Sequence, residues 1–274
     1  MPRITASHSV KTRPPAVAGR FYPDDPAELR CLVEALLREV KPADAPAPKA
    51  VIAPHAGYIY SGPIAASAHA RLAPARDVIK RVVLIGPAHF VPFKGLAATG
   101  AEAWTTPLGA VPVDLNAVQE ICSLPQVTVL DKAHAREHSF EVHLPFLQVV
   151  LGDFNIVPLA VGDASDEEVA AVIEALWSGD ETRFVISSDL SHYHGYARAQ
   201  QLDAAAARAI EELRPQDIGE GQACGRIPIC GLLRAARRHG LRARTVDLRN
   251  SGDTAGPRDE VVGYGAWTFE EAAK

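Results

Sequence analysis

The run Val82-Val83-Leu84-Ile85-Gly86-Pro87-Ala88-His89 decides the fold class of this chain. Its apolar, β-branched residues are typical of a strand buried on both faces, as in a parallel sheet. A proline and then a histidine follow at once, and Val51-Ile52-Ala53-Pro54-His55 repeats that order. A third apolar run, Phe184 to Ser187, leads to Asp189 and His192. Because ligands gather at the carboxyl ends of strands in an open α/β sheet, we expect these imidazoles to meet in one cleft.

Helical patterns alternate with the strand-like runs. Asp25 to Glu28 reads as an N-cap followed by a proline, and an apolar stripe continues to Val40. Similar patterns predict helices from Ser165 to Trp177 and from Pro228 to His239. The expected strands are residues 51–54, 82–85, 156–161, 183–187, 243–248 and 261–269. This alternation predicts an α/β fold with a central, mostly parallel or mixed sheet flanked by helices, to which residues 97–113 add an antiparallel piece.

The domain organisation follows from composition. The chain has 274 residues, of which 47% are hydrophobic, enough for one large core. Residues 1–12 are polar and expected to be flexible, whereas residues 13–274 show no repeat or change of composition and are expected to form one domain.

Charge and hydropathy exclude several classes of partner. The 28 basic and 33 acidic residues give a net charge of −5 without a dense basic run, so nucleic acid is not an expected partner. No apolar stretch approaches the roughly 20 residues that cross a bilayer, and the first residues lack the apolar core of a secretion signal. We therefore expect a cytoplasmic protein without membrane contact. The four cysteines form no C-x-x-C pair and are expected to be reduced.

A metal site needs a donor besides His55 and His89. Asn250-Ser251-Gly252-Asp253 supplies a carboxylate in a glycine-punctuated loop, although Asp253 also fits a simple turn. Two histidines and one carboxylate form the facial set that holds non-haem Fe(II) and leaves positions open for substrate and dioxygen. The sequence thus favours a metal centre of His55, His89 and Asp253.

Two further segments offer acid, base and binding groups. Asp189 and His192 form a carboxylate–imidazole pair suited to general acid–base catalysis, with a helix cap and surface histidine as the simpler interpretation. His138, Glu141 and His143 lie close together but do not form the H-E-x-x-H motif of zinc proteases. They are candidates for orienting or substrate-binding roles, and a purely structural role is equally open.

Six ordered motifs carry a resemblance. They are A-G-R-F-Y-P at 18–23, A-P-H-A-G-Y at 53–58, G-P-A-H at 86–89, H-S-F-E-V-H-L-P-F at 138–146, S-S-D-L-S-H at 187–192 and N-S-G-D at 250–253. Together they resemble the Memo family, also called the AmmeMemoRadiSam system protein B family, from about Arg13 to Phe269.

The resemblance implies an α/β fold similar to that of the class III extradiol dioxygenases. It also implies that His55 and His89 bind metal, that Asp253 takes the third ligand position and that His192 is the acid–base histidine. Animal members carry a cysteine at that third position, and a carboxylate there favours Fe(II) over Cu(I). Tyr58 and Cys224 fall in family segments and are expected to border the cleft, although a buried structural thiol is as good an interpretation of Cys224.

Three functions remain open on the sequence. The first is a non-haem Fe(II) redox enzyme acting on a small substrate, with copper or zinc as alternative metals. The second is a binding module for a peptide or partner, since the resemblance extends to animal Memo proteins that interact with phosphotyrosine peptides. The third is a zinc hydrolase with a metal-activated water. Neither the substrate nor the oligomeric state can be inferred from the sequence.

Overall fold

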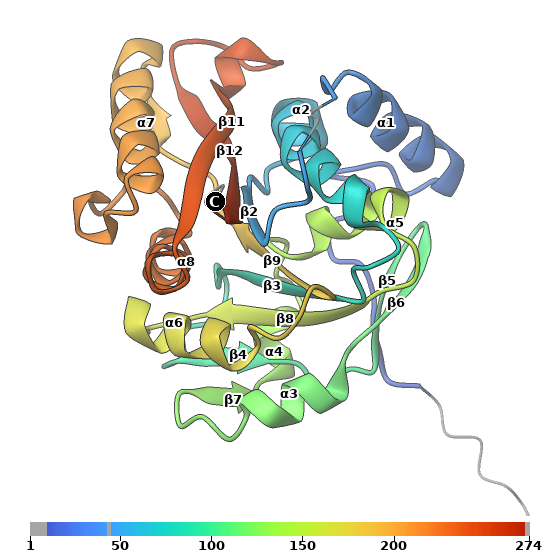
Figure 1. Ribbon diagram of the computed structural model, residues 1–274. Coiled ribbons are helices and arrows are strands. Elements are labelled where there is room, and N and C mark those ends of the chain that lie inside the picture. Colours follow the sequence, from blue (N-terminus) through green and yellow to red (C-terminus); the bar gives the residue numbers. More distant parts are fainter. Residues whose placement is uncertain (1–9, 43–44, 272–274) are drawn as a thin grey trace, which may run out of the picture.

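A computed structural model describes residues 10–42 and 45–271 (Figure 1). The helices are α1 (Pro26–Arg38), α2 (Tyr58–His69), α3 (Leu115–Ile121), α4 (Asp131–His134), α5 (Leu144–Val150), α6 (Asp166–Ala175), α7 (Tyr196–Glu211) and α8 (Arg226–Arg238). Four short 3-10 helices are η1 (Ala70–Ala75), η2 (Glu141–His143), η3 (Pro215–Asp217) and η4 (Ser251–Asp253).

The strands form two sheets. They are β1 (Thr12–Arg13), β2 (Ala50–Ala53), β3 (Arg81–Pro87), β4 (Leu96–Ala98), β5 (Ala103–Thr106), β6 (Gly109–Pro112), β7 (Val127–Val129), β8 (Asn155–Val161), β9 (Thr182–Ser187), β10 (His192–His194), β11 (Leu241–Asn250) and β12 (Val261–Glu271). Strands β1, β5 and β6 make a small sheet, and the main sheet has the order β10-β12-β2-β9-β3-β8-β4-β7 with β11 paired to β12.

The centre of the main sheet is parallel and its margins are antiparallel. Strands β2, β9, β3 and β8 run in parallel, whereas β12 pairs antiparallel with β2, and β4 antiparallel with β8. The predicted mixed α/β sheet is therefore confirmed. Of residues 97–113, only the end of β4 adds an antiparallel piece to it, whereas β5 and β6 pair with each other in the small sheet. Because four adjacent strands end at the same edge, the segments that follow them lie side by side.

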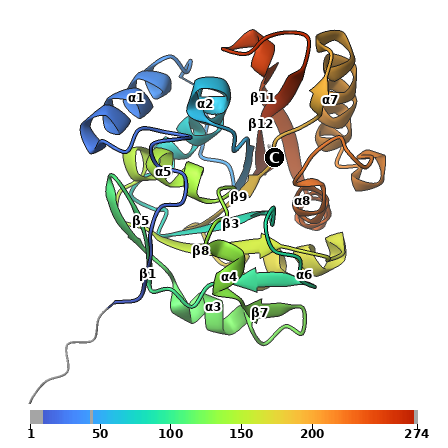
Figure 2. The same ribbon diagram turned by 180° about the vertical axis from the view of Figure 1, so that it is seen from behind.

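Helices cover both faces of the sheet. Figures 1 and 2 show α1, α2 and α5 on one face, with α6, α7 and α8 on the other. The capping residues predicted at the N-termini of two helices make the expected hydrogen bonds. Asp25 caps α1 through the backbone N–H groups of Ala27 and Glu28, and Ser165 and Glu168 form a reciprocal capping box on α6. The strands between these layers are almost wholly buried, which explains their uninterrupted apolar sequences.

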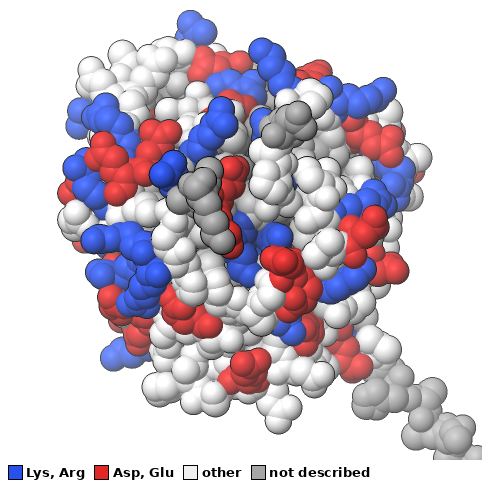
Figure 3. Space-filling model, viewed as in Figure 1, with Lys and Arg blue, Asp and Glu red and all other residues white. Residues whose placement is uncertain are grey.

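Several expectations concern termini, surface and thiols. Residues 1–9 of the predicted flexible segment lie outside the described residues, while Thr12 already belongs to β1, which pairs in parallel with β5. Basic and acidic side chains are interspersed on the face in Figure 3. No described helix is long and apolar enough to cross a membrane. The four cysteines are free thiols, as predicted.

Candidate metal centre

Three neighbouring strands deliver the residues of the site to one edge of the sheet. His55 follows β2 by two residues, His89 follows β3 by two residues, and Asp189 follows β9 by two residues. Strand β9 lies between β2 and β3 and pairs in parallel with both. The sequence-based expectation that these segments meet at the carboxyl ends of the strands is thus met by the topology.

Three histidines form a compact cluster. His55, His89 and His138 each present a ring nitrogen, and these atoms all lie within 4.8 Å of one another. The ring centroids are 5.2 Å apart for His55 and His89, 5.4 Å for His55 and His138, and 4.7 Å for His89 and His138. His138 comes from the segment between α4 and η2, so it joins the cluster from outside the parallel strands. This geometry suits a single metal ion.

A buried carboxylate, Glu137, holds two of these histidines. Its oxygens accept hydrogen bonds from the Nδ1 of His89 at 2.8 Å and from the backbone N–H groups of His89, His138 and Ser139. Burial alone would raise the pKa of Glu137, but these donors lower the pKa to about 2. An ionised carboxylate only accepts, so His89 carries a proton on Nδ1, and Nε2 is the nitrogen left for another partner. A carboxylate behind an imidazole is a common arrangement around bound metals.

The hydroxyl of Ser187 fixes the tautomer of His55. It donates to the carbonyl of Ser139 at 2.5 Å and also contacts the Nδ1 of His55 at 2.6 Å and the Nε2 of His143 at 2.9 Å. A hydroxyl has one proton, so both histidine nitrogens must donate to it. His55 is therefore protonated on Nδ1, and its Nε2 is left as the lone pair that faces the cluster.

His143 and His69 extend this series of hydrogen bonds from Ser187 into the core. With its Nε2 donating, His143 accepts at Nδ1 from the Nε2 of His69 at 3.1 Å. Burial lowers the pKa of His143 to about 3 and lowers the pKa of His69 as well, so both rings are neutral. The predicted cleft residue His143 is fully buried and acts on His55 through Ser187.

Asp189 and Cys224 complete the wall beside His55. One carboxylate oxygen of Asp189 accepts from the backbone N–H of His55 at 2.8 Å, and the other lies 4.0 Å from its Nε2. Burial raises the pKa of Asp189 to about 6. The Sγ of Cys224 lies 3.4 Å from the Nε2 of His55, and burial, together with Asp189, raises the pKa of its thiol to about 12. Gly225 permits this approach, because a Cβ there would lie 2.5 Å from the carbonyl oxygen of Ser187.

His192 lies on the margin of the site, in β10. Its Nδ1 is 2.8 Å from the carbonyl oxygen of Leu190, and the ring lies close enough to His55 and Asp189 to influence their pKa values. The structure therefore brings the predicted acid–base pair of Asp189 and His192 near the cluster. Burial and the neighbouring histidines lower the pKa values of His55 and His138, the latter to about 4, so these rings are neutral donors.

Asp253 was expected as the third metal ligand, but the structure places it outside the cluster of His55, His89 and His138. It sits in η4, where one carboxylate oxygen accepts from the backbone N–H of Asn250 at 3.0 Å and the other from the Tyr196 hydroxyl at 2.5 Å. The carboxylate thus stabilises the turn in which it lies. This agrees with the simpler interpretation of Asp253 as a turn residue. Within the described part of the chain, His138 occupies the third position, and the cysteine next to the cluster is Cys224.

Glu141 and Tyr58 face away from the cluster. Glu141 is fully buried, pairs with Arg13 and accepts from the Tyr22 hydroxyl at 2.5 Å and from the backbone N–H groups of Ala16 and Val17. Tyr58 packs in the hydrophobic cluster between α1, α2 and α5 and donates to the carbonyl of Val142 at 2.6 Å. These contacts hold the chain together rather than offering groups to a ligand.

Sequence reasoning did not assign Glu137 and Ser187 to the site. Glu137 directly precedes His138, and Ser187 is the last residue of a predicted strand. A carboxylate adjacent to a candidate histidine was the available signal for Glu137. No comparable signal marks Ser187, since its role depends on three partners that lie far from it in the sequence.

Comparisons with known proteins cover nearly the whole chain. A family model described as "Memo-like protein" matches residues 13–268. A "MEMO1 family protein" of Aquifex aeolicus is 35% identical over 266 residues, covering 93% of this chain and 98% of the relative. Relatives of the same description from Ignicoccus hospitalis and Saccharolobus solfataricus are 36% and 35% identical, each covering 94% of this chain and at least 98% of their own.

Proposed function

We propose that this chain, which belongs to the Memo-like protein family, is a metal-dependent redox enzyme. The family model and the relatives match the chain over almost its whole length. Its metal would be Fe(II), with copper or zinc as alternatives, and His55, His89 and His138 would hold it. The convergence of these three imidazoles, whose ring nitrogens lie within 4.8 Å of one another, carries the proposal.

The chemistry of the donors fits a transition metal. Metal binding needs unprotonated nitrogen, and lowered pKa values keep His55 and His138 neutral. The Nδ1 protons of His55 and His89 are committed to Ser187 and Glu137, so Nε2 is the nitrogen that each ring has left for a metal. Imidazole suits iron, copper, zinc and nickel. The ligands are therefore preorganised by buried partners, which is typical of sites that retain a metal.

Access and neighbouring groups favour catalysis over a structural role. Structural metal sites are closed, whereas the side chains of His89 and His138 are 28% and 15% exposed. Cys224 and Ala88, beside His89, also line a cavity of about 480 Å³, a size that accepts a small molecule. We infer that a small-molecule substrate approaches the cluster from this side.

The chain supplies groups that hold and move protons. A bound Fe(II) ion would supply one-electron chemistry and open positions for substrate and dioxygen. Asp189, fixed by the N–H of His55, and His192, fixed by the Leu190 carbonyl, are placed to accept or return a substrate proton. Burial of Asp189 keeps bulk water from competing for these transfers.

The test begins with metal loading. Protein freed of metal by a chelator and reconstituted anaerobically should bind about one Fe(II), measured by mass spectrometry of bound metal. His55→Ala and His138→Ala should lose that binding. His194→Ala is the matched control, because His194 lies on β10 outside the cluster. Retained stoichiometric binding in both cluster variants would overturn the site.

A second assay addresses the reaction. The Fe(II)-loaded protein should consume dioxygen in the presence of a responsive catechol or a related reductant, and His55→Ala should not. If a broad panel of catechols and reductants gives no oxygen uptake above that of His55→Ala, the redox proposal fails while the metal site stands.

Zinc hydrolysis is a second candidate, and one observation favours it. The third cluster member is a histidine instead of a carboxylate, and three histidines with an open position form a ligand set of zinc enzymes that activate water. Ester hydrolysis by the zinc-loaded protein, lost in His89→Ala and absent with Fe(II), would favour this alternative.

A further inference from the structure

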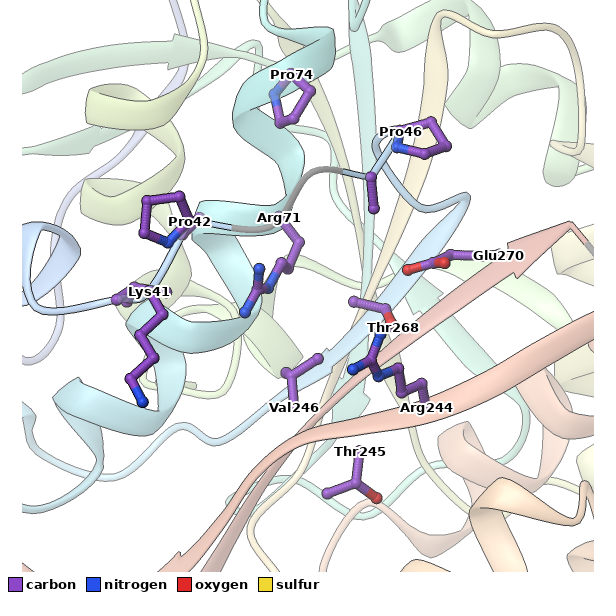
Figure 4. A pocket seen from close by; sticks show the side chains of 13 residues that line it. Lys41, Pro42, Pro46, Arg71, Pro74, Arg244, Thr245, Val246, Thr268 and Glu270 are labelled. Atoms are coloured by element: carbon purple, nitrogen blue, oxygen red, sulfur yellow. The ribbon is translucent and has the colours of Figure 1, made fainter. Parts of the chain in front are cut away.

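A second polar cavity lies at the opposite edge of the sheet from the histidine cluster. It has a volume of about 200 Å³ and is lined by η1, β11, β12 and residues 40–42 and 45–46 (Figure 4). Phe269 on β12 pairs with Ala50 at the start of β2, whereas His55 follows the end of β2. The cavity is therefore independent of the candidate metal centre and of the function proposed for it.

The cavity carries an excess of positive charge. Among the described residues, three basic side chains line it together with one carboxylate: Lys41, Arg71, Arg244 and Glu270. Within residues 10–42 and 45–271, none of these four side chains makes an ion pair with another residue. Arg71 is half-buried and differs in this from the half-buried Arg81, Arg234 and Arg249, which are all paired with carboxylates. In Figure 4 the polar ends of Arg244 and Glu270 lie on the side of Thr268, and the guanidinium of Arg71 lies between them and Lys41.

Two buried polar atoms of the cavity have no hydrogen-bond partner in the described structure. One is the Oγ1 of Thr268, a residue only 1% exposed, and the other is the Nε of Arg71. Leaving such a group unpaired costs roughly 1 to 3 kcal/mol, so unpaired buried donors in a cavity point to a missing acceptor. Thr268 lies directly opposite Arg244 in the β11–β12 register, which puts both side chains on the same face of the sheet.

We propose that this cavity binds a small oxyanion of the phosphate class, either free phosphate or the phosphate group of a small ester. Arg71 and Arg244 each offer planar N–H donors that match phosphate oxygens, and the Thr268 hydroxyl donates from the floor of the cavity. Lys41 adds a point charge at the rim. Glu270 accepts from a protonated oxygen of the anion or from a hydroxyl of the ester, so the single carboxylate selects for a ligand that also carries a donor.

The experiment is a calorimetric titration of the full chain with inorganic phosphate, in a buffer of low ionic strength that contains no phosphate. Parallel titrations use glycerol 3-phosphate as the small ester and chloride as the control anion. Saturable binding of phosphate or of the ester, but not of chloride, is expected. A free-anion site gives similar affinities for the two phosphates, and an ester site gives clearly tighter binding of glycerol 3-phosphate.

Variants separate this cavity from other surfaces. Arg71→Gln should weaken binding about tenfold or more, since it removes a charged donor. Arg237→Gln, an equal change of charge on the exposed end of α8 and outside the cavity, should leave the affinity unchanged. Thr268→Val keeps the shape of the side chain, so it should weaken binding several-fold without unfolding the protein.

Three results would overturn the proposal. They are the absence of saturable binding of both phosphates to the unaltered chain, an unchanged affinity in Arg71→Gln, and an equal loss in Arg237→Gln. If the Thr268→Val variant were more stable and bound phosphate as tightly as the parent, the Thr268 hydroxyl would not be part of the binding site.

Discussion

Glu137 and Glu141 are both fully buried and lie four residues apart, yet they serve opposite sides of the same segment. Glu137 faces the histidine cluster and binds His89 together with three backbone N–H groups. Glu141 faces the N-terminal segment, where Arg13 and Tyr22 surround it. Identical side chains four residues apart thus orient histidines on one side and hold the N-terminal segment in place on the other. The partners of a buried carboxylate, rather than its motif, decide its role.

Removing the carboxylate of Glu141 should have the largest effect, on stability. Glu141→Ala leaves the buried guanidinium of Arg13 without its counter-charge and two backbone N–H groups without an acceptor. Breaking a buried ion pair from one side costs about 3 to 5 kcal/mol. We expect a loss of that size in the free energy of unfolding, measured by urea denaturation.

The control for this variant is Glu28→Ala, which removes an exposed carboxylate from the first turn of α1. It should cost less than about 1 kcal/mol. If Glu141→Ala were as stable as the Glu28 variant but failed to bind metal, Glu141 would belong with the cluster after all.

Altering Glu137 should mainly weaken metal binding. Glu137→Gln keeps the size of the side chain but replaces one acceptor oxygen by an amide group facing N–H donors. Loss of such a partner behind a ligand typically lowers metal affinity about 10- to 100-fold. Competition with a chelating dye should reveal this drop for Fe(II) or Zn²⁺.

Glu141→Gln supplies the matched comparison for metal affinity. The same substitution four residues away should change the affinity of the folded protein by less than about twofold, since Glu141 contacts no cluster histidine through its side chain. Equal losses in both variants would abolish the distinction between the two sides.

The fold and part of the cluster were accessible from the sequence for a physical reason. A strand buried on both faces has an apolar pattern, and a histidine directly after it must lie at the carboxyl edge of the sheet, as His55 and His89 do. Local periodicity is enough for such positions. The same holds for α1 and α6, whose capping residues are sequence neighbours.

The remaining assignments depended on contacts between distant residues. Glu141 was expected at the cleft because its neighbours are histidines, but Arg13, 128 positions away, binds it on the other side. Asp253 was expected as a ligand because its loop is rich in glycine, but Asn250 and Tyr196 engage its carboxylate. The contact with Asn250 is local and agrees with the interpretation of this loop as a turn, whereas Arg13 and Tyr196 are distant partners that spacing along the sequence does not reveal.

Acidic pH should lower the stability of the protein through His134, which lies on the side of this segment that binds Arg13. The backbone carbonyl of His134 accepts two hydrogen bonds from Arg13, and its buried ring donates from Nε2 to the carbonyl of Ala97. Burial lowers the pKa of His134 from 6.5 to about 4. Between these two values the unfolded chain binds a proton that the folded chain does not, so stability falls as the pH falls from 6.5 toward 4.

His134→Gln keeps an N–H donor but cannot titrate, so it should reduce this acid sensitivity. Between pH 6.5 and about pH 5 the native protein should lose about 2 kcal/mol more than the variant, as measured by urea denaturation at each pH. Identical slopes for the two proteins would mean that His134 takes up its proton equally in both states.

The smallest effect is expected at Asp253, where the sequence placed a ligand and the structure places a turn. Asp253→Asn retains an oxygen for the backbone N–H of Asn250 and loses the charge that accepts from the Tyr196 hydroxyl and lies 3.9 Å from the exposed guanidinium of Arg258. Metal affinity should therefore stay within about twofold of the parent, and the free energy of unfolding within about 1 kcal/mol. His138→Asn, a change to the same residue type inside the cluster, should in contrast abolish binding. If Asp253→Asn also lost the metal, the loop after β11 would have to close over the histidines when the ion binds.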